Sequence, residues 1–168
     1  MQMKRVSIVV PVYNEEANIR PFYRAVCREM SQLPYDWELL FVDDGSGDDS
    51  WHILETLAEE DARIRPMQLS RNMGHQIALT CGMDHAEGDA VITMDGDMQH
   101  PPALIPVLAR RWEEGYDIVQ TVRLETEDAP LLKRISSRAY YRLLNFISDV
   151  PILEGGSDFR LMDMRVLH

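Results

Sequence analysis

The sequence predicts an α/β protein with a mostly parallel central sheet and helices on both faces. Short apolar runs alternate along the chain with segments whose apolar residues recur at helical spacing. Such short, β-branched runs are typical of strands that are buried on both faces of a parallel sheet. Neither an internal repeat nor a linker interrupts the alternation, so residues 1–168 are expected to form a single domain.

The first two strand–helix units follow from this spacing. Residues 6–10 predict a buried strand, and residues 11–14 are expected to turn from it into a helix. Residues 39–42 predict a second buried strand, and either Asp48 or Asp49 is placed to cap the helix that follows. Each helix carries one apolar stripe. The stripes consist of Ile19, Phe22, Tyr23, Val26, Met30 and Leu33 in the first helix, and Ile53, Leu54, Leu57 and Ala58 in the second.

The third strand–helix unit is less clearly marked in the sequence, because its strand is weaker. Residues 64–69 predict a strand that Pro66 places near an edge of the sheet, because proline cannot donate to a strand ladder. A turn at residues 71–74 leads into a helix. The apolar residues of this helix are Ile77, Ala78 and Cys81.

The last predicted elements are two strands separated by a helix. Residues 90–94 form a buried strand that ends at Asp95. Pro101 and Pro102 suit the first turn of the helix, and residues 116–122 predict the fifth strand. The helix is expected to bury Leu104, Ile105, Leu108 and Trp112.

Composition restricts the classes of partner. The net charge of −11 argues against nucleic acid, because phosphate binding needs a concentrated basic face. Cys27 and Cys81 lie far apart without metal-type spacing, which favours reduced core thiols over a disulfide. The apolar stretch near the N-terminus is short and broken by Pro11, so a first strand is favoured over a signal peptide. The protein is expected in the cytoplasm or at the cytoplasmic face of a membrane.

Asp95 and Asp97, separated by Gly96, are the strongest local signal. They follow a buried strand, and ligands of parallel sheets bind beyond the carboxyl ends of the strands. Two carboxylates on such a loop can face one hard cation, and oxygen ligands suit Mg²⁺ or Mn²⁺. A solvated acidic turn is the alternative interpretation of these residues alone.

Two further polar segments also follow predicted strands. Asp43, at the start of the segment DDGS, can accept hydrogen bonds from a ribose or a base, and Tyr13 and Glu15 can offer a ring and a carboxylate to a nucleobase. Ordinary turn chemistry explains either segment by itself. His75 and His100 neighbour the motifs and either can contact a phosphate, although backbone hydrogen bonds are the expected partners of both rings.

The motifs VVPVYNE, VDDGS, LSRNMGHQIAL, MDGDMQHPP and GGSDFRLMD, in this order, resemble those of the family-two glycosyltransferases. The resemblance covers nearly the whole chain and is strongest to the polyprenyl-phosphate branch, which includes the dolichol-phosphate mannose synthases. It implies a GT-A fold and inversion at the anomeric carbon of the sugar. Relatives usually continue beyond the DFRL motif, so the chain ending at His168 is expected to be a C-terminally truncated fragment rather than a natural short form.

The resemblance also implies which residues bind the nucleotide-sugar donor. Asp95 and Asp97 would hold the Mg²⁺ or Mn²⁺ ion, and Asp97 would be catalytic together with Asp158. The nucleotide-binding residues would be Pro11, Tyr13, Glu15, Asp43, Asp95 and Gln99.

The acceptor side would be a lipid phosphate. The resemblance places Asp158 near the acceptor, and Arg123, Lys133 and Arg160 at donor or acceptor phosphates. Since a phosphate monoester is already largely ionised near neutral pH, Asp158 would orient the acceptor rather than deprotonate it. The alternative for Asp158 is an N-cap of a helix over residues 159–166.

Residues 131–150 predict an amphipathic basic helix. Apolar residues recur there at helical spacing, and four of the 17 basic residues interleave with them: Lys133, Arg134, Arg138 and Arg142. Such a helix can lie on an anionic membrane surface, where a lipid phosphate is found. An ordinary helix that packs on the sheet with solvated arginines is an equal alternative.

The sequence therefore predicts an inverting, metal-dependent hexosyltransferase that moves a sugar from a nucleotide sugar, with UDP favoured, to a polyprenyl phosphate such as undecaprenyl phosphate. The alternatives are a GDP-mannose-dependent enzyme similar to dolichol-phosphate mannose synthase, and a sugar-nucleotide-binding module without turnover. A nucleotidyltransferase or a dinucleotide oxidoreductase is disfavoured, because no glycine-rich signature follows the first strand. A homo-oligomer is compatible with the sequence.

Overall fold

The computed structural model describes residues 3–122 and 156–167. In these residues six strands form one sheet, in the order β3-β2-β1-β4-β6-β5. The strands are β1 (Arg5–Val12), β2 (Asp36–Asp43), β3 (Ile64–Gln68), β4 (Ala90–Thr93), β5 (Ile118–Val122) and β6 (Gly156–Asp163). The helices are α1 (Glu16–Met30), α2 (Ser50–Glu60), α3 (His75–Asp84) and α4 (Ile105–Glu113), with single 3₁₀ turns at Pro102–Leu104 and Met164–Val166.

The chain divides into two compact units. One consists of Met1–Val119 and Asp158–His168, and the other is Gln120–Ser157. The single-domain expectation for residues 1–168 stays a prediction. The expected basic helix at 131–150 lies outside the described residues, as do Arg123 and Lys133.

The sheet is mostly parallel, as predicted. β1 pairs in parallel with β2 and β4, and β2 pairs in parallel with β3. β6 is the exception, because it runs antiparallel to β4, with Thr93 opposite Arg160. Asp158 therefore lies in a strand, and its alternative role as a helix N-cap is wrong. Phe159 and Leu161 alternate with half-buried residues and point into the core, a period-two pattern that suits a strand.

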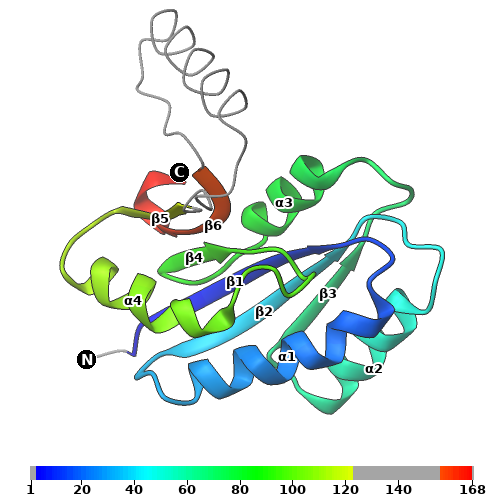
Figure 1. Ribbon diagram of the computed structural model, residues 1–168, viewed down its shortest axis with the longest axis horizontal. Coiled ribbons are helices and arrows are strands. Elements are labelled where there is room, and N and C mark those ends of the chain that lie inside the picture. The colour runs from blue at the N-terminus through cyan, green and yellow to red at the C-terminus, as the bar shows by residue number, and fades with distance from the viewer. Residues whose placement is uncertain (1–2, 123–155, 168) are drawn as a thin grey trace, which may run out of the picture. The chain divides into compact units, whose positions relative to one another are not determined.

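Helices cover both faces of the sheet (Figure 1). Along β1, Val6, Ile8, Val10 and Val12 pack on one face with apolar residues of α1, α2 and α4. Val9 points to the opposite face, where it packs with Leu79 of α3. Because successive strand residues alternate between faces, one short strand contributes to both cores. In the described residues, no helix is long and apolar enough to cross a membrane.

Several expected positions differ in detail. β1 extends through Pro11 to Val12, so the turn begins later than predicted. Leu104, expected in the core, has an exposed fraction of 37%, and Ile77 has one of 48%. Pro66 does lie in the edge strand β3, as predicted. Both cysteines are free thiols.

Gly82 sets how closely α3 approaches the sheet. A Cβ atom there would collide with the Val9 side chain and lie 3.1 Å from Val42 Cγ2, and both valines are fully buried. Gly82→Ala is therefore expected to lower the free energy of unfolding by about 1–3 kcal/mol through overpacking, although alanine favours a helix interior by about 1 kcal/mol. Urea denaturation measures the change. Gly47→Ala is the control, since no atom lies within 4 Å of a Cβ at Gly47. Equal stability of Gly82→Ala and wild type would show that α3 is not in such close contact.

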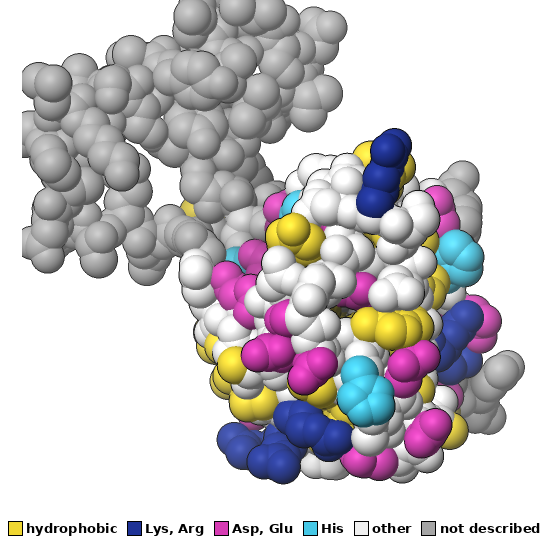
Figure 2. All heavy atoms as spheres, turned by 90° about the vertical axis from the view of Figure 1, so that its right-hand side faces the viewer, with side chains coloured by type: hydrophobic (Ala, Val, Ile, Leu, Met, Phe, Trp, Pro, Cys, Tyr) yellow, Lys and Arg dark blue, Asp and Glu magenta, His cyan; other side chains and the backbone are white. Residues whose placement is uncertain are grey.

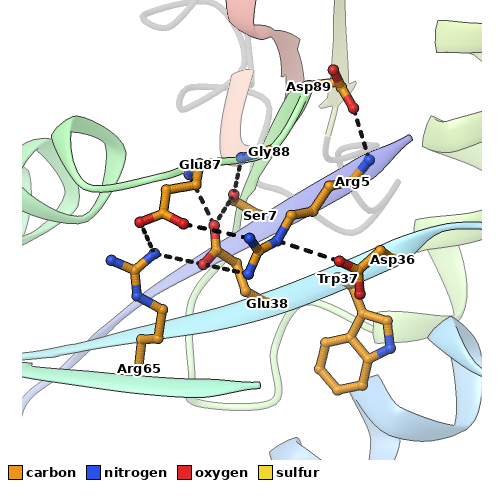
Figure 3. A network of polar contacts seen from close by, with 9 residues as sticks. All are labelled: Arg5, Ser7, Asp36, Trp37, Glu38, Arg65, Glu87, Gly88 and Asp89. Carbon is orange, nitrogen blue, oxygen red and sulfur yellow. Dashed lines mark hydrogen bonds and ion pairs between the residues drawn. The ribbon is translucent and has the colours of Figure 1, made fainter. Parts of the chain in front are cut away.

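A buried carboxylate joins the first strands at the edge opposite the polar turns (Figure 3). Glu38 is fully buried, and its oxygens accept hydrogen bonds from Ser7 Oγ at 2.6 Å and Arg65 Nη1 at 2.6 Å. The backbone N–H of Glu87 donates to it at 2.9 Å, and Arg5 Nη2 lies at 3.2 Å. The hydrogen bonds and ion pairs of this Glu38 network connect β1, β2, β3 and the segment before β4.

Candidate active site

The carboxyl ends of β1, β2 and β4 enclose a pocket of about 360 Å³. Figure 2 looks onto this edge of the sheet, where acidic side chains gather. The lining residues come from the end of β1, from the turns that follow these strands, and from the turn and first residue at the start of α3. They are Pro11, Val12, Tyr13, Glu15, Asp44, Asn72, Gly74, His75, Asp95, Gly96 and Asp97.

The structure brings together five of the predicted nucleotide- or metal-binding residues. Pro11, Tyr13, Glu15, Asp95 and Asp97 all line the pocket. The carboxyl ends of neighbouring parallel strands meet at one edge, so the convergence follows from the topology. The individual roles of these residues stay predictions.

Asp43 and Gln99 do not line the pocket. Asp43 is fully buried and accepts hydrogen bonds from Ser46 N at 3.2 Å and Gln68 Nε2 at 3.2 Å. The next residue, Asp44, lines the pocket instead. Gln99 is exposed, and its backbone N–H donates to Asp97 Oδ1 at 2.9 Å. Through these hydrogen bonds, the buried Asp43 side chain stabilises the turn after β2.

The turns after β1 and β2 are fastened to each other. Asn14 N donates to Ser46 Oγ at 2.9 Å, and Gly47 N donates back to Asn14 Oδ1 at 2.8 Å. Glu15 N donates to Ser50 Oγ at 3.0 Å. Asn14 has a positive φ of 53°, a conformation that asparagine tolerates better than most residues. These hydrogen bonds stabilise the turn that carries Tyr13 and Glu15, and both residues line the pocket.

Asp44 positions the turn before α3. Its carboxylate accepts hydrogen bonds from the backbone N–H groups of Met73 at 2.6 Å and Gly74 at 3.0 Å. Gly45 lies close to the same turn. A Cβ atom at Gly45 would be only 2.6 Å from the carbonyl carbon of Arg71, so the absence of a side chain allows this close approach. The sequence analysis named Asp43 and not Asp44, since two adjacent aspartates carry no local signal of which one faces the pocket; the nucleotide-binding role of Asp43 stays a prediction.

The loop after β4 presents two carboxylates. Asp95 has one oxygen, Oδ1, that is buried and makes no hydrogen bond in the described part of the chain. Its Oδ2 lies 3.2 Å from His100 Nδ1, the atom that also accepts from Asp95 N at 3.3 Å. The buried His100 ring packs on Phe159 with centroids 5.5 Å apart. Gly96 lets the loop lie close to β1, since a Cβ would be 3.1 Å from Val10 Cγ1.

Asp158 lies near this loop through the pairing of β6 with β4. Thr93 Oγ1 donates to the backbone carbonyl of Asp158 at 2.6 Å. Asp158 Oδ1 lies 3.5 Å from Arg160 Nη2, and Asp158 Oδ2 lies 3.5 Å from His75 Nε2. Arg160 Nε is buried without a hydrogen-bond partner in residues 3–122 and 156–167. Arg160 is not among the residues that line the pocket.

The donor set fits a cation that is shared with a substrate. Among the described residues, no group of three or more His, Cys, Asp or Glu side chains is arranged to hold a metal ion. Mg²⁺ typically takes only one or two protein carboxylates together with water and substrate phosphates. Asp95, whose buried Oδ1 accepts no hydrogen bond in the described residues, and the neighbouring Asp97 meet that requirement.

Comparison with known proteins identifies the family. The sequence profile of glycosyl transferase family 2 matches residues 7–168. The chain is 44% identical to the uncharacterized glycosyltransferase YkcC of Bacillus subtilis, over 95% of this chain and 50% of that protein. It is 43% identical to the bactoprenol glucosyl transferase of Shigella phage SfV, over 97% of this chain and 53% of that protein. The chain thus spans about half the length of the curated relatives that it matches.

Solved structures confirm the fold. Glucosyl-3-phosphoglycerate synthase from Mycobacterium tuberculosis, in complex with Mn²⁺, UDP-glucose and phosphoglyceric acid, superposes with a TM-score of 0.65 at 20% identity, over 98% of this chain and 58% of that chain. The mannosyltransferase PcManGT from Pyrobaculum calidifontis, in complex with GDP-mannose and Mn²⁺, gives 0.62 at 20% identity, over 99% and 46%. The sheet is therefore that of the GT-A glycosyltransferases, and the chain belongs to glycosyl transferase family 2.

Proposed function

We propose that the protein transfers a hexose, with inversion, from a UDP-sugar to a polyprenyl phosphate at the cytoplasmic face of a membrane. The observation that carries the proposal is the pocket at the sheet edge, where the exposed ring of Tyr13 and the carboxylates of Asp95 and Asp97 line one cavity. Relatives that are 43% identical and bear the name bactoprenol glucosyl transferase support a lipid-linked acceptor and make glucose the first sugar to test.

The donor side uses residues of the turns after β1 and β4. Tyr13 lines the pocket and is 48% exposed, so its ring would be accessible to a base, and stacking on an aromatic ring contributes about 1–3 kcal/mol per base. Asp95 and Asp97 would share Mg²⁺ or Mn²⁺ with the diphosphate. The bound cation would neutralise the negative charge that develops on the departing UDP.

The acceptor side uses Asp158 and Arg160. Arg160 Nε is unpaired in the described residues and would bind a phosphate oxygen. A second phosphate oxygen attacks the anomeric carbon from the face opposite the diphosphate. The new carbon–oxygen bond forms as the bond to the UDP oxygen breaks, so the configuration inverts. Asp158 orients the acceptor, since a phosphate monoester that is already ionised needs no strong base.

A transfer assay tests the proposal. The protein is incubated with undecaprenyl phosphate in vesicles and with radiolabelled UDP-glucose, other UDP-sugars or GDP-mannose. We expect label from a UDP-sugar in the lipid extract, and we expect EDTA to abolish transfer. Labelling from GDP-mannose alone would identify the mannose synthase activity instead. Donor binding by calorimetry without transfer would identify a binding module.

A further inference from the structure

His75 lines the pocket and contacts both Asp95 of the pocket and Asp158 of β6. Its Nε2 is 3.5 Å from Asp95 Oδ1 and 3.5 Å from Asp158 Oδ2. Asp95 follows β4, whereas Asp158 lies in β6, so one ring nitrogen faces carboxylates from two different strands. The expectation that backbone groups satisfy this histidine does not hold for Nε2.

The position of His75 is set independently of those two carboxylates. His75 is the first residue of α3, and the preceding backbone is fixed by Asp44 through Met73 N and Gly74 N. Gly74 has a φ of 98°, which turns the chain into the helix. Buried Ala78 and Leu79 then anchor α3 on the sheet. The position of the imidazole is therefore set by Asp44, which follows β2, and by α3.

The two carboxylates need such a partner. Like charges repel when they share one site, so a hydrogen-bond donor between the two carboxylates offsets part of their repulsion. Asp158 has additional long contacts to Gln76 Nε2 at 3.5 Å and Arg160 Nη2 at 3.5 Å. Asp95 Oδ1 makes no hydrogen bond in the described residues, and His75 Nε2 lies 3.5 Å from it. Contacts of 3.5 Å are long, and hydrogen bonds of unliganded enzymes often shorten when substrate binds.

We propose that His75 is a positioning residue whose Nε2–H bridges Asp95 and Asp158. The bridge sets the separation between the carboxylate that holds the donor and the carboxylate that orients the acceptor. It therefore acts on the alignment of the attacking phosphate with the anomeric carbon, and not on donor affinity. This inference rests on the proposed function, because it assigns a role within the same site.

The kinetic test compares His75→Ala and His75→Gln. Misplacement of reacting groups by about 1 Å can cost about 10²-fold, so His75→Ala is expected to lower kcat by about 10–100-fold while the KM for the donor changes less than about threefold. Glutamine places an amide N–H near the position of Nε2 and is expected to restore a large part of kcat. The control is His52→Ala, since His52 lies exposed on α2. Any of three results would overturn the bridge. The first is an unchanged kcat in His75→Ala, and the second is a rise in the KM for the donor as large as the fall in kcat. The third is a kcat of His75→Gln that is no higher than that of His75→Ala.

A second measurement needs no turnover. In a long-range ¹H–¹⁵N spectrum of the imidazoles, the Nε2 signal of His75 is expected to shift in Asp158→Asn and in Asp95→Asn, while the His52 signal stays in place. A His75 signal that is unaffected by both substitutions overturns the bridge even if the enzyme is active. Failure of the proposed function would appear differently, as wild-type protein that transfers no sugar from any UDP-sugar to lipid.

Discussion

Asp97→Ala is expected to abolish cation-dependent binding of the nucleotide sugar and to lower turnover by about 10²–10³-fold, the usual loss when one group that stabilises transition-state charge is removed. Asp97 and Asp95 are the two carboxylates of the pocket loop that fit a shared cation. With only one of them left, the protein would offer a single carboxylate to the metal–diphosphate pair. Calorimetric titration of UDP-glucose with and without Mn²⁺ measures the binding loss, and the lipid transfer assay measures turnover.

The fold of the Asp97→Ala variant is expected to survive. The hydrogen bond that this side chain accepts comes from the backbone of Gln99, within the same loop. Such a local bond contributes about 1 kcal/mol. Asp84→Ala is the matched control, because Asp84 is an exposed carboxylate at the last residue of α3, outside the pocket lining. Donor affinity and metal dependence that persist in Asp97→Ala would remove Asp97 from the site.

Glu38→Gln is expected to destabilise the protein strongly, although Glu38 lies outside the pocket lining. Removing one partner of a buried ion pair typically costs 3–5 kcal/mol. The Arg5 and Arg65 side chains are 34% and 35% exposed and can regain water, so a loss of about 3 kcal/mol is expected. For a domain of this size, that loss lowers Tm by about 6–12 °C. Urea denaturation and thermal unfolding measure it.

Glu87→Gln provides the matched control for the Glu38 network. Glu87 contacts the same two arginines, with Oε1 3.0 Å from Arg65 Nη1 and Oε2 3.4 Å from Arg5 Nη1. Its side chain is 59% exposed, however, and exposed ion pairs contribute at most about 1 kcal/mol. Equal losses for Glu38→Gln and Glu87→Gln would show that burial of Glu38 does not strengthen its contacts.

The Glu38 contribution depends on pH with a definite sign. Burial by itself raises the pKa of Glu38, but hydrogen bonds from Ser7, Arg65 and the Glu87 backbone, with the charge of Arg5, outweigh burial and hold the pKa below its usual 4.5. A carboxylate with a lowered folded-state pKa stabilises the protein above its ordinary pKa and loses that contribution as the pH falls through the folded value. The stability difference between wild type and Glu38→Gln should therefore be full at neutral pH and shrink below about pH 4.5.

Local patterns were sufficient for most of the sheet. The runs at residues 6–10, 39–42 and 90–94 lie within β1, β2 and β4, apart from the last residue of the third run, because continuous apolar segments are typical of doubly covered strands. Pro66 indicated the edge strand, because proline cannot donate a backbone hydrogen bond to a neighbouring strand. Parallel neighbours bring their carboxyl ends together, so the convergence of Tyr13, Asp95 and their neighbours on one pocket was also predictable.

The strand β6 was not predictable from its own residues. The segment GGSDFRLMD suits either a strand or a capped helix, since short apolar runs carry both patterns. Its assignment depends on β4, which supplies an antiparallel partner from Ala90 to Thr93. That pairing is what brings Asp158 near the loop that carries Asp95.

The sequence by itself determined the α/β class, the edge of the sheet that carries the pocket and the two carboxylates around Gly96. All of these depend on residues that are neighbours in the chain. Only the tertiary structure decided that Asp44 rather than Asp43 faces the pocket, and that His75 lies between Asp95 and Asp158. The physical reason is that the direction of a side chain at a strand end, and its contacts with distant strands, depend on register and packing across the whole sheet.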